Sequence, residues 1–228
     1  MKEEFYTRGR WQNWINKIKE SGFTLQESEE DPSAAVFVYA MDDVVLACLK
    51  VIARCEHGTI TKEDAVSAID EIRDIVSERD ESLGEDANLM LESLNASLSA
   101  VFLASQRYIE GGYDRKTPLE DMVRKAATAE EAGRMEEALG ILSDIGARVI
   151  GGEAVPEEAF AELPYCMTAE LLDGIDAISA AQVGDDSYKE DDGSEDDGED
   201  AQHEERGAVE IPSRAVERGV QLAVDRHA

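Results

Sequence analysis

The chain has few cysteines, few bases and few aromatic residues for its length. Three cysteines in 228 residues cannot form a framework of paired bridges, so we expect free, buried thiols in a reducing cytosol. The 22 lysines and arginines face 52 aspartates and glutamates, and clustered bases are what a protein needs to bind nucleic-acid phosphates. These shortages argue against a disulfide-stabilised secreted domain, and they disfavour both nucleic acid and an anionic membrane surface as partners.

A long uninterrupted hydrophobic run is also missing. Residues Ala34–Ala53 come closest, but Asp42, Asp43 and Lys50 interrupt them, whereas a spanning helix needs about 20 mostly apolar residues. The first residues have no apolar stretch after their charges, so no signal peptide is predicted. We therefore expect a cytoplasmic protein that makes no contact with the membrane.

Negative charge is what the chain has in excess. The formal net charge is −30 at pH 7, and outside residues 185–206, which hold twelve acids and two bases, 40 acids still face 20 bases. Such a surface repels itself in dilute buffer, whereas at about 1 M salt the Debye length falls to roughly 3 Å. The composition indicates adaptation to molar internal salt, with ordinary acidic solubility as the alternative.

Apolar residues recur at helical spacing along most of the chain, and strand-like alternation is rare. Thr7 and Thr61 are predicted N-caps, the latter in a capping box with Asp64. Helices are predicted over about 8–20, from Asp31 to Gly58, after Thr61, over about 85–110, 117–132 and 134–151, and from Pro156 and Thr168. We predict an all-α multi-helix bundle over 1–183, with a division near 112–117 left open.

The second predicted helix is the expected hub of this bundle, because most of its surface is apolar. Its polar side chains gather within about 60° of arc at 100° per residue: Tyr39, Asp43, Lys50, Arg54 and His57. Asp42 falls instead among apolar positions, where a carboxylate needs a partner. It is either hydrogen-bonded to a neighbouring helix or half of an acid/base or metal site. Asp42 and Asp43 are therefore the catalytic candidates, and His57 is expected to cap the helix end.

Beyond Val183 the composition changes sharply. Residues 184–207 consist mainly of Asp, Glu, Ser and Gly, which predicts a disordered acidic linker that spans about 25–28 Å. Residues 208–228 regain a helical pattern with no net charge and one broad apolar arc, which predicts a short amphipathic helix. This helix is expected either to fold back onto its own bundle or to bind a partner, through Ile211, Ala215, Val216, Val220, Leu222 and Val224.

Motifs for a reaction or a cofactor were not found in the sequence. There is no phosphate-binding glycine loop, no zinc-ligand spacing and no Glu-x-x-His pair, so neither a cofactor nor a metal is predicted. The segment Arg8–Trp14 interleaves bases with tryptophans, a pattern seen in single-strand binding. We prefer a helix that docks its tryptophans on the core. Segments 117–132 and 134–151 are interpreted as a bundle hairpin, because a helical repeat needs three or more units.

Three stretches carry a family resemblance: Glu4–Ile15, Asp42-Asp43-Val44 and Ser105–Ile109. Over about residues 4–180 the chain resembles an uncharacterised archaeal family found in salt-loving archaea and methanogens. The resemblance implies an archaeal, intracellular, helical protein of unknown function, and it supplies no catalytic residues. The acidic run and the terminal amphipathic segment lie beyond the resembling part.

These observations lead us to expect a non-catalytic protein–protein interaction or regulatory protein of a high-salt archaeal cytoplasm. The partner is expected to be a protein, and a homo-oligomer stays open. Two alternatives also stay open. One is an enzyme with a carboxylate site between bundle helices, and the other is an acidic mimic of nucleic acid.

Overall fold

The computed structural model describes residues 3–25, 32–78, 82–156, 158–159, 163 and 166–184. Over these residues the chain forms α-helices and one short 3-10 helix, with no strand among them, so the predicted all-α class is confirmed. The predicted linker beyond Gly184 and the predicted helix 208–228 lie outside the described residues. The elements are α1 (Arg8–Ser21), η1 (Pro32–Ala34), α2 (Ala35–Glu56), α3 (Lys62–Val76), α4 (Glu85–Glu110), α5 (Leu119–Glu131), α6 (Met135–Ile150) and α8 (Met167–Gly184).

The predicted helix ends are confirmed by local hydrogen bonds. The Thr7 hydroxyl accepts from the backbone N–H of Arg10 at 3.0 Å, and the Thr61 hydroxyl accepts from that of Asp64 at 3.1 Å. Each bond satisfies a backbone donor that has no partner inside its own helix. His57 is the C-terminal cap residue of α2, as expected.

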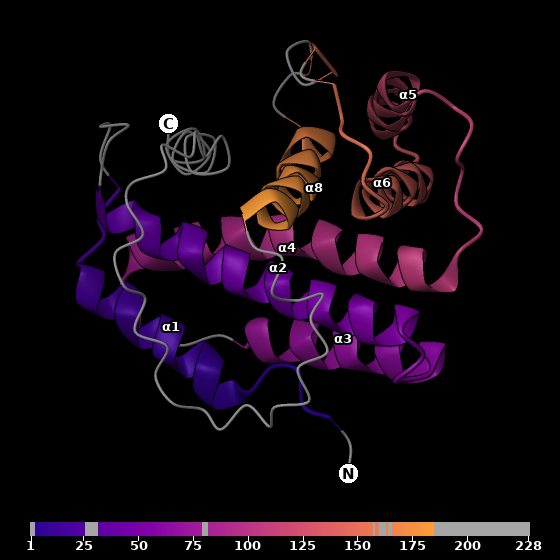
Figure 1. The fold of residues 1–228 in the computed structure, drawn as a ribbon. Helices are drawn as coiled ribbons and strands as arrows, with labels where there is room; N and C mark the ends of the chain where they lie inside the picture. The colour runs from indigo at the N-terminus through magenta and orange to yellow at the C-terminus, as the bar shows by residue number, and fades with distance from the viewer. Residues whose placement is uncertain are drawn as a thin grey trace.

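The helices cross in two groups that share α4 (Figure 1). Helices α2 and α4 lie side by side, with α1 and α3 along one side of them and α5, α6 and α8 on the other side, running across them. Helix α4 contacts α2 and α3 from one group and α6 and α8 from the other. Helix α2 contacts α1, α3, α4 and α8, as the predicted hub should, and α4 is a second hub because it also contacts α6.

Small residues explain why α4 takes this position. A Cβ built on Gly174 of α8 would lie 2.1 Å from the backbone oxygen of Ser97, and one built on Gly146 of α6 would lie 2.4 Å from the Cβ of Ala104. Only the missing Cβ atoms let α6 and α8 approach the α4 backbone this closely. The helical pattern of the sequence does not reveal such contacts, since each depends on one glycine meeting one particular residue of α4.

The predicted apolar stripes are buried. On α1 this holds for both tryptophans, Trp11 and Trp14, and on α4 and α8 for all the predicted inward positions. The cysteine expectation is only partly right, because Cys48 is buried but Cys55 and Cys166 are half-buried; all three are free. The buried residues of α4 and α8 are Ala87, Met90, Leu91, Leu94, Leu98, Val101, Phe102, Ile109, Leu171, Leu172, Ile175 and Ile178.

Helix α4 is also long and apolar enough to cross a membrane by length and composition, and it is the one such helix in the part of the chain that the structure describes. More than half of its apolar window is buried inside the protein. Four helices pack around it, which is the environment of a core helix.

Candidate functional site

The carboxylate of Asp43 accepts hydrogen bonds from three side chains at the contact between α1 and α2. The donors are the Tyr6 hydroxyl at 2.9 Å, the Trp14 indole N–H at 2.7 Å and the Arg10 guanidinium at 2.5 to 3.2 Å. We call these four residues the Asp43 cluster. Charge-assisted bonds of this kind are among the stronger ones in proteins. The cluster fastens the first helix to the second.

The cluster also accounts for the bases and tryptophans of Arg8–Trp14. Trp11 and Trp14 are buried, Arg10 pairs with Asp43, and Arg8 forms an ion pair with Glu78 beyond α3. The preferred sequence interpretation, a helix that docks its tryptophans on the core and its bases against nearby acids, matches this arrangement. Burial leaves neither indole free to stack on a nucleic-acid base.

Asp42, one residue earlier on α2, has a different environment. Its side chain is half-buried, and none of the described residues donates a hydrogen bond to it. Burial, with a smaller contribution from the charge of Asp43, raises the pKa of Asp42 to about 6. Within the described residues the expected bond to a neighbouring helix is therefore not found. A carboxyl with a raised pKa is what an acid/base group requires.

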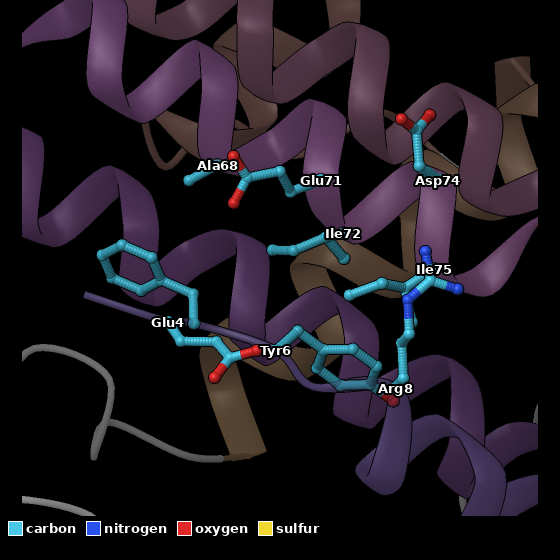
Figure 2. Close-up of a pocket in the computed structure, with 9 residues that line it drawn as sticks. Glu4, Tyr6, Arg8, Ala68, Glu71, Ile72, Asp74 and Ile75 are labelled. Carbon is cyan, nitrogen blue, oxygen red and sulfur yellow. The ribbon is translucent and has the colours of Figure 1, made fainter. Parts of the chain in front are cut away.

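A small pocket of about 240 Å³ lies between the N-terminal segment and α3 (Figure 2). Tyr6 lines it and belongs to the Asp43 cluster as well. Carboxylates from Glu4, Glu71 and Asp74 stand around it with the Arg8 guanidinium. The pocket thus carries mixed charge at its rim and apolar surface from α3 at its base. No group of three or more metal-binding side chains occurs among the described residues.

A larger groove of about 590 Å³ opens where α2, α6 and α8 end together. Its volume falls in the range of ligand-binding clefts. Val183, at the last turn of α8, is 90% exposed at its edge. The large apolar residues that line the groove from α2 and α6 are themselves buried, so Val183 is the exposed large apolar side chain of this lining. The apolar lining consists of Leu49, Ile52, Ala53, Val149, Ile150, Ala154 and Val183.

Polar groups of the groove are mostly held by contacts within the protein. The Tyr108 hydroxyl donates to Glu56 at 2.6 Å, and burial together with that bond raises the pKa of Tyr108. Gln182 donates to the backbone oxygen of Ile150 at 3.0 Å, and Glu153 pairs with Arg148 at 2.5 Å. His57 is exposed on the rim. The groove is thus an apolar floor with a polar edge whose acids, Glu56 and Glu153, are already hydrogen-bonded.

Sequence reasoning identified Asp42 and Asp43, which are neighbours on α2 but have separate roles. The predicted partner-binding residues of the tail lie outside the described residues. The groove was missed, because its large apolar residues come from the ends of three helices that are far apart in the sequence. Val183 was a partial signal, since it is the last apolar residue before the acidic run.

Comparison with known proteins places the chain in a family without giving it a function. The chain matches no curated protein and no solved structure. A family model described as an uncharacterised protein conserved in archaea (DUF2150) matches residues 4–191. This match confirms the resemblance inferred from the opening segment, and it leaves residues 192–228 outside the shared part. The chain belongs to this uncharacterised archaeal family.

Proposed function

We propose that this protein is a non-catalytic interaction or regulatory protein of a high-salt archaeal cytoplasm, and that it binds a protein partner through the groove between α2, α6 and α8. The exposed Val183 at the edge of the apolar lining is the observation that carries the proposal. Apolar surface in contact with water is unfavourable, and a partner that covers this surface at the groove would remove it from water.

The geometry fits an amphipathic helix as the partner element. Helix-in-groove binding uses an apolar floor for anchors at helical spacing and a polar rim for orientation. Here the floor comes from Leu49, Ile52 and Val149, and the rim from Glu56, His57 and Gln182. Family membership supports the archaeal setting, and the net charge of −30 supports the high-salt setting, because molar salt screens such repulsion.

A groove substitution with a matched control tests the proposal. Val183→Glu places a charge at the groove edge, and Met135→Glu makes the same change at the start of α6, where Met135 is 41% exposed and outside the groove. Co-purification in molar potassium chloride should recover one protein with the wild type and with Met135→Glu, and lose it with Val183→Glu. Equal recovery by all three chains would reject the groove as the binding site.

An enzyme is the second candidate, and Asp42 favours it. The Asp42 carboxyl is half-buried, has no hydrogen-bond donor among the described residues, and has a pKa near 6. Catalytic acids and bases often have these properties, although such groups lower the stability of the fold. The stability of Asp42→Asn, treated in the Discussion, tests this candidate without knowledge of a substrate.

A further inference from the structure

Glu56, the last residue of α2, carries a charge that the described part of the protein leaves unbalanced. Its exposed side chain lines the groove and accepts one hydrogen bond, from the neutral Tyr108 hydroxyl at 2.6 Å. No described lysine, arginine or histidine forms an ion pair with it. A carboxylate has about four acceptor sites, so Glu56 can accept further donors.

Glu153, the other acid of the groove, already has a cation within the protein. Arg148 donates to both of its carboxylate oxygens, at 2.9 and 2.5 Å, which makes a bidentate ion pair. The described residues that line the groove include no lysine or arginine. The groove therefore presents one carboxylate without a cation, Glu56, together with the exposed apolar side chain of Val183.

The Asp43 cluster shows how this protein completes a pair of this kind. There too a tyrosine hydroxyl donates to a carboxylate, from Tyr6 to Asp43 at 2.9 Å. The Arg10 guanidinium binds the same carboxylate and lies 5.2 Å from the centre of the Tyr6 ring. The tyrosine thus holds the carboxylate in place and offers its ring to the arginine, which combines an ion pair with a cation–π contact.

Glu56 and Tyr108 form the same tyrosine–carboxylate pair without the arginine. Tyr108 is half-buried and lines the groove together with Glu56. Arginine fits this pair better than lysine, because its planar guanidinium binds a carboxylate through two N–H groups and also stacks on aromatic rings. A metal ion fits less well, since no group of three or more metal-binding side chains occurs in the part of the chain that the structure describes.

Arg115 is close to this pair but is held elsewhere. Tyr113 stacks on Tyr108 with 6.1 Å between the ring centres. Arg115 lies over the Tyr113 ring, 4.6 Å from its centre, and donates to the Tyr113 hydroxyl at 2.8 Å. The position beside Glu56 is therefore left for an arginine that the described part of the protein does not supply.

We infer that the partner of the groove is a basic amphipathic helix, which places an arginine against Glu56 and Tyr108 and an apolar side chain against Val183. This inference deepens the proposed function and rests on it. Long-range attraction between a basic partner and this acidic chain is screened in molar salt. The specificity of binding then depends on the short-range contact at Glu56, where hydrogen bonds and the aromatic ring act together.

A displayed library of randomised helical peptides, selected on the full chain in molar potassium chloride, supplies the probes. The peptides kept for study bind the wild type and Met135→Glu but not Val183→Glu, so their binding depends on the groove. Arginine should be enriched several-fold over the unselected library at one position of these peptides. An arginine content equal to that of the unselected library would overturn the inference.

A double-mutant cycle then assigns the peptide arginine to Glu56. Glu56→Gln removes the charge but keeps a side-chain oxygen that can accept the Tyr108 hydroxyl, and Glu136→Gln removes the same charge from an exposed site on α6 outside the groove. Glu56→Gln should weaken peptide binding by about 10- to 100-fold, as should glutamine in place of the peptide arginine. The two changes together should weaken it little more than either alone. Equal affinities of the Glu56→Gln and Glu136→Gln chains would overturn the inference.

The remaining outcomes separate this inference from the proposed function. Peptides that depend on Val183 but bind Glu56→Gln as tightly as the wild type would keep the groove as a binding site and overturn the basic partner. A selection that yields no peptide dependent on Val183 would overturn both. Arginine amide alone should bind far more weakly than the selected peptides; a comparable affinity would indicate a small cationic ligand and overturn the inference.

Discussion

The carboxylate of Asp43 accepts the indole N–H of Trp14 at 2.7 Å, across the contact between α2 and α1. The same carboxylate also accepts from Tyr6 and Arg10, so one side chain orders the whole amino-terminal segment. Tyr6, Arg10 and Trp14 all lie in the stretch that first indicated the archaeal family. The recognisable opening of the sequence is therefore the part that fastens α1 to the bundle.

Removing the carboxylate should loosen that attachment. Asp43→Ala leaves the Trp14 indole N–H buried without its acceptor and removes the partner of Arg10, and losses of this kind cost about 2–4 kcal/mol. Asp74→Ala is the control, because Asp74 is 73% exposed. Denaturant unfolding measures both variants, and comparable stabilities for the two would contradict a structural role for Asp43.

Asp42→Asn should stabilise the protein at neutral pH. The folded pKa of about 6 lies above the ordinary value of 3.8, so the folded state binds a proton more tightly than the unfolded state. Wild-type stability from this group is therefore present at low pH and falls as the pH rises from about 4 to about 6. At pH 7 the variant should gain up to about 3 kcal/mol, and the gain should shrink towards pH 4.

Denaturant unfolding at several pH values, with Asp74→Asn as an exposed control, checks this expectation. A variant less stable than the wild type at pH 7 would show that the Asp42 carboxylate has a stabilising partner. That outcome would remove the support that Asp42 gives to an enzymatic role.

Gly174→Ala should destabilise the contact between α8 and α4. The new Cβ would lie 2.1 Å from the Ser97 oxygen, which forces a backbone shift, and overpacking typically costs about 1–3 kcal/mol. Gly140→Ala on α6 is the matched control, since nothing lies within 4 Å of its Cβ position. There alanine should add about 1 kcal/mol through its higher helix propensity. A similar effect of both substitutions on the thermal midpoint would disprove close packing at Gly174.

Potassium chloride should stabilise the protein steeply between dilute buffer and molar salt. The net charge of −30 repels itself, and the Debye length shrinks from about 10 Å at 0.1 M to about 3 Å at 1 M. Thermal unfolding across a salt series measures the gain, with a non-ionic osmolyte as control because excluded solutes also stabilise folded proteins. Equal effects of salt and osmolyte would favour ordinary acidic solubility over adaptation to high salt.

Much of the fold could be predicted because the signals of helix formation lie within a few residues of one another in the sequence. The stripe of Trp11, Trp14, Ile15 and Ile18 and the N-cap at Thr61 depend on residues close together in the chain. The extent of α4 was predicted for the same reason. The glycine contacts that α4 receives from α6 and α8 were not predicted, since periodicity shows which face of a helix is apolar but not which helix packs on it.

The candidate sites divide in the same way. Asp42 stood out because a carboxylate at an apolar position of a helix is visible in the pattern. Whether a hydrogen-bond donor lies next to Asp42 depends on the side chains of the neighbouring helices. The sequence pattern therefore could not predict the pKa of Asp42. The groove had almost no local signal, since Leu49, Val149 and Val183 lie on three different helices.

The amino-acid sequence by itself determined the helices, their buried faces, the excess of negative charge and the family, because each of these depends on composition or on neighbours within a few turns. Tertiary structure alone decided that α6 and α8 pack closely on α4, that Asp43 holds α1 while Asp42 has no donor among the described residues, and that the ends of α2, α6 and α8 form a groove. The physical reason is that these features depend on close approach between distant segments, where single missing Cβ atoms and the placement of single donors set the outcome.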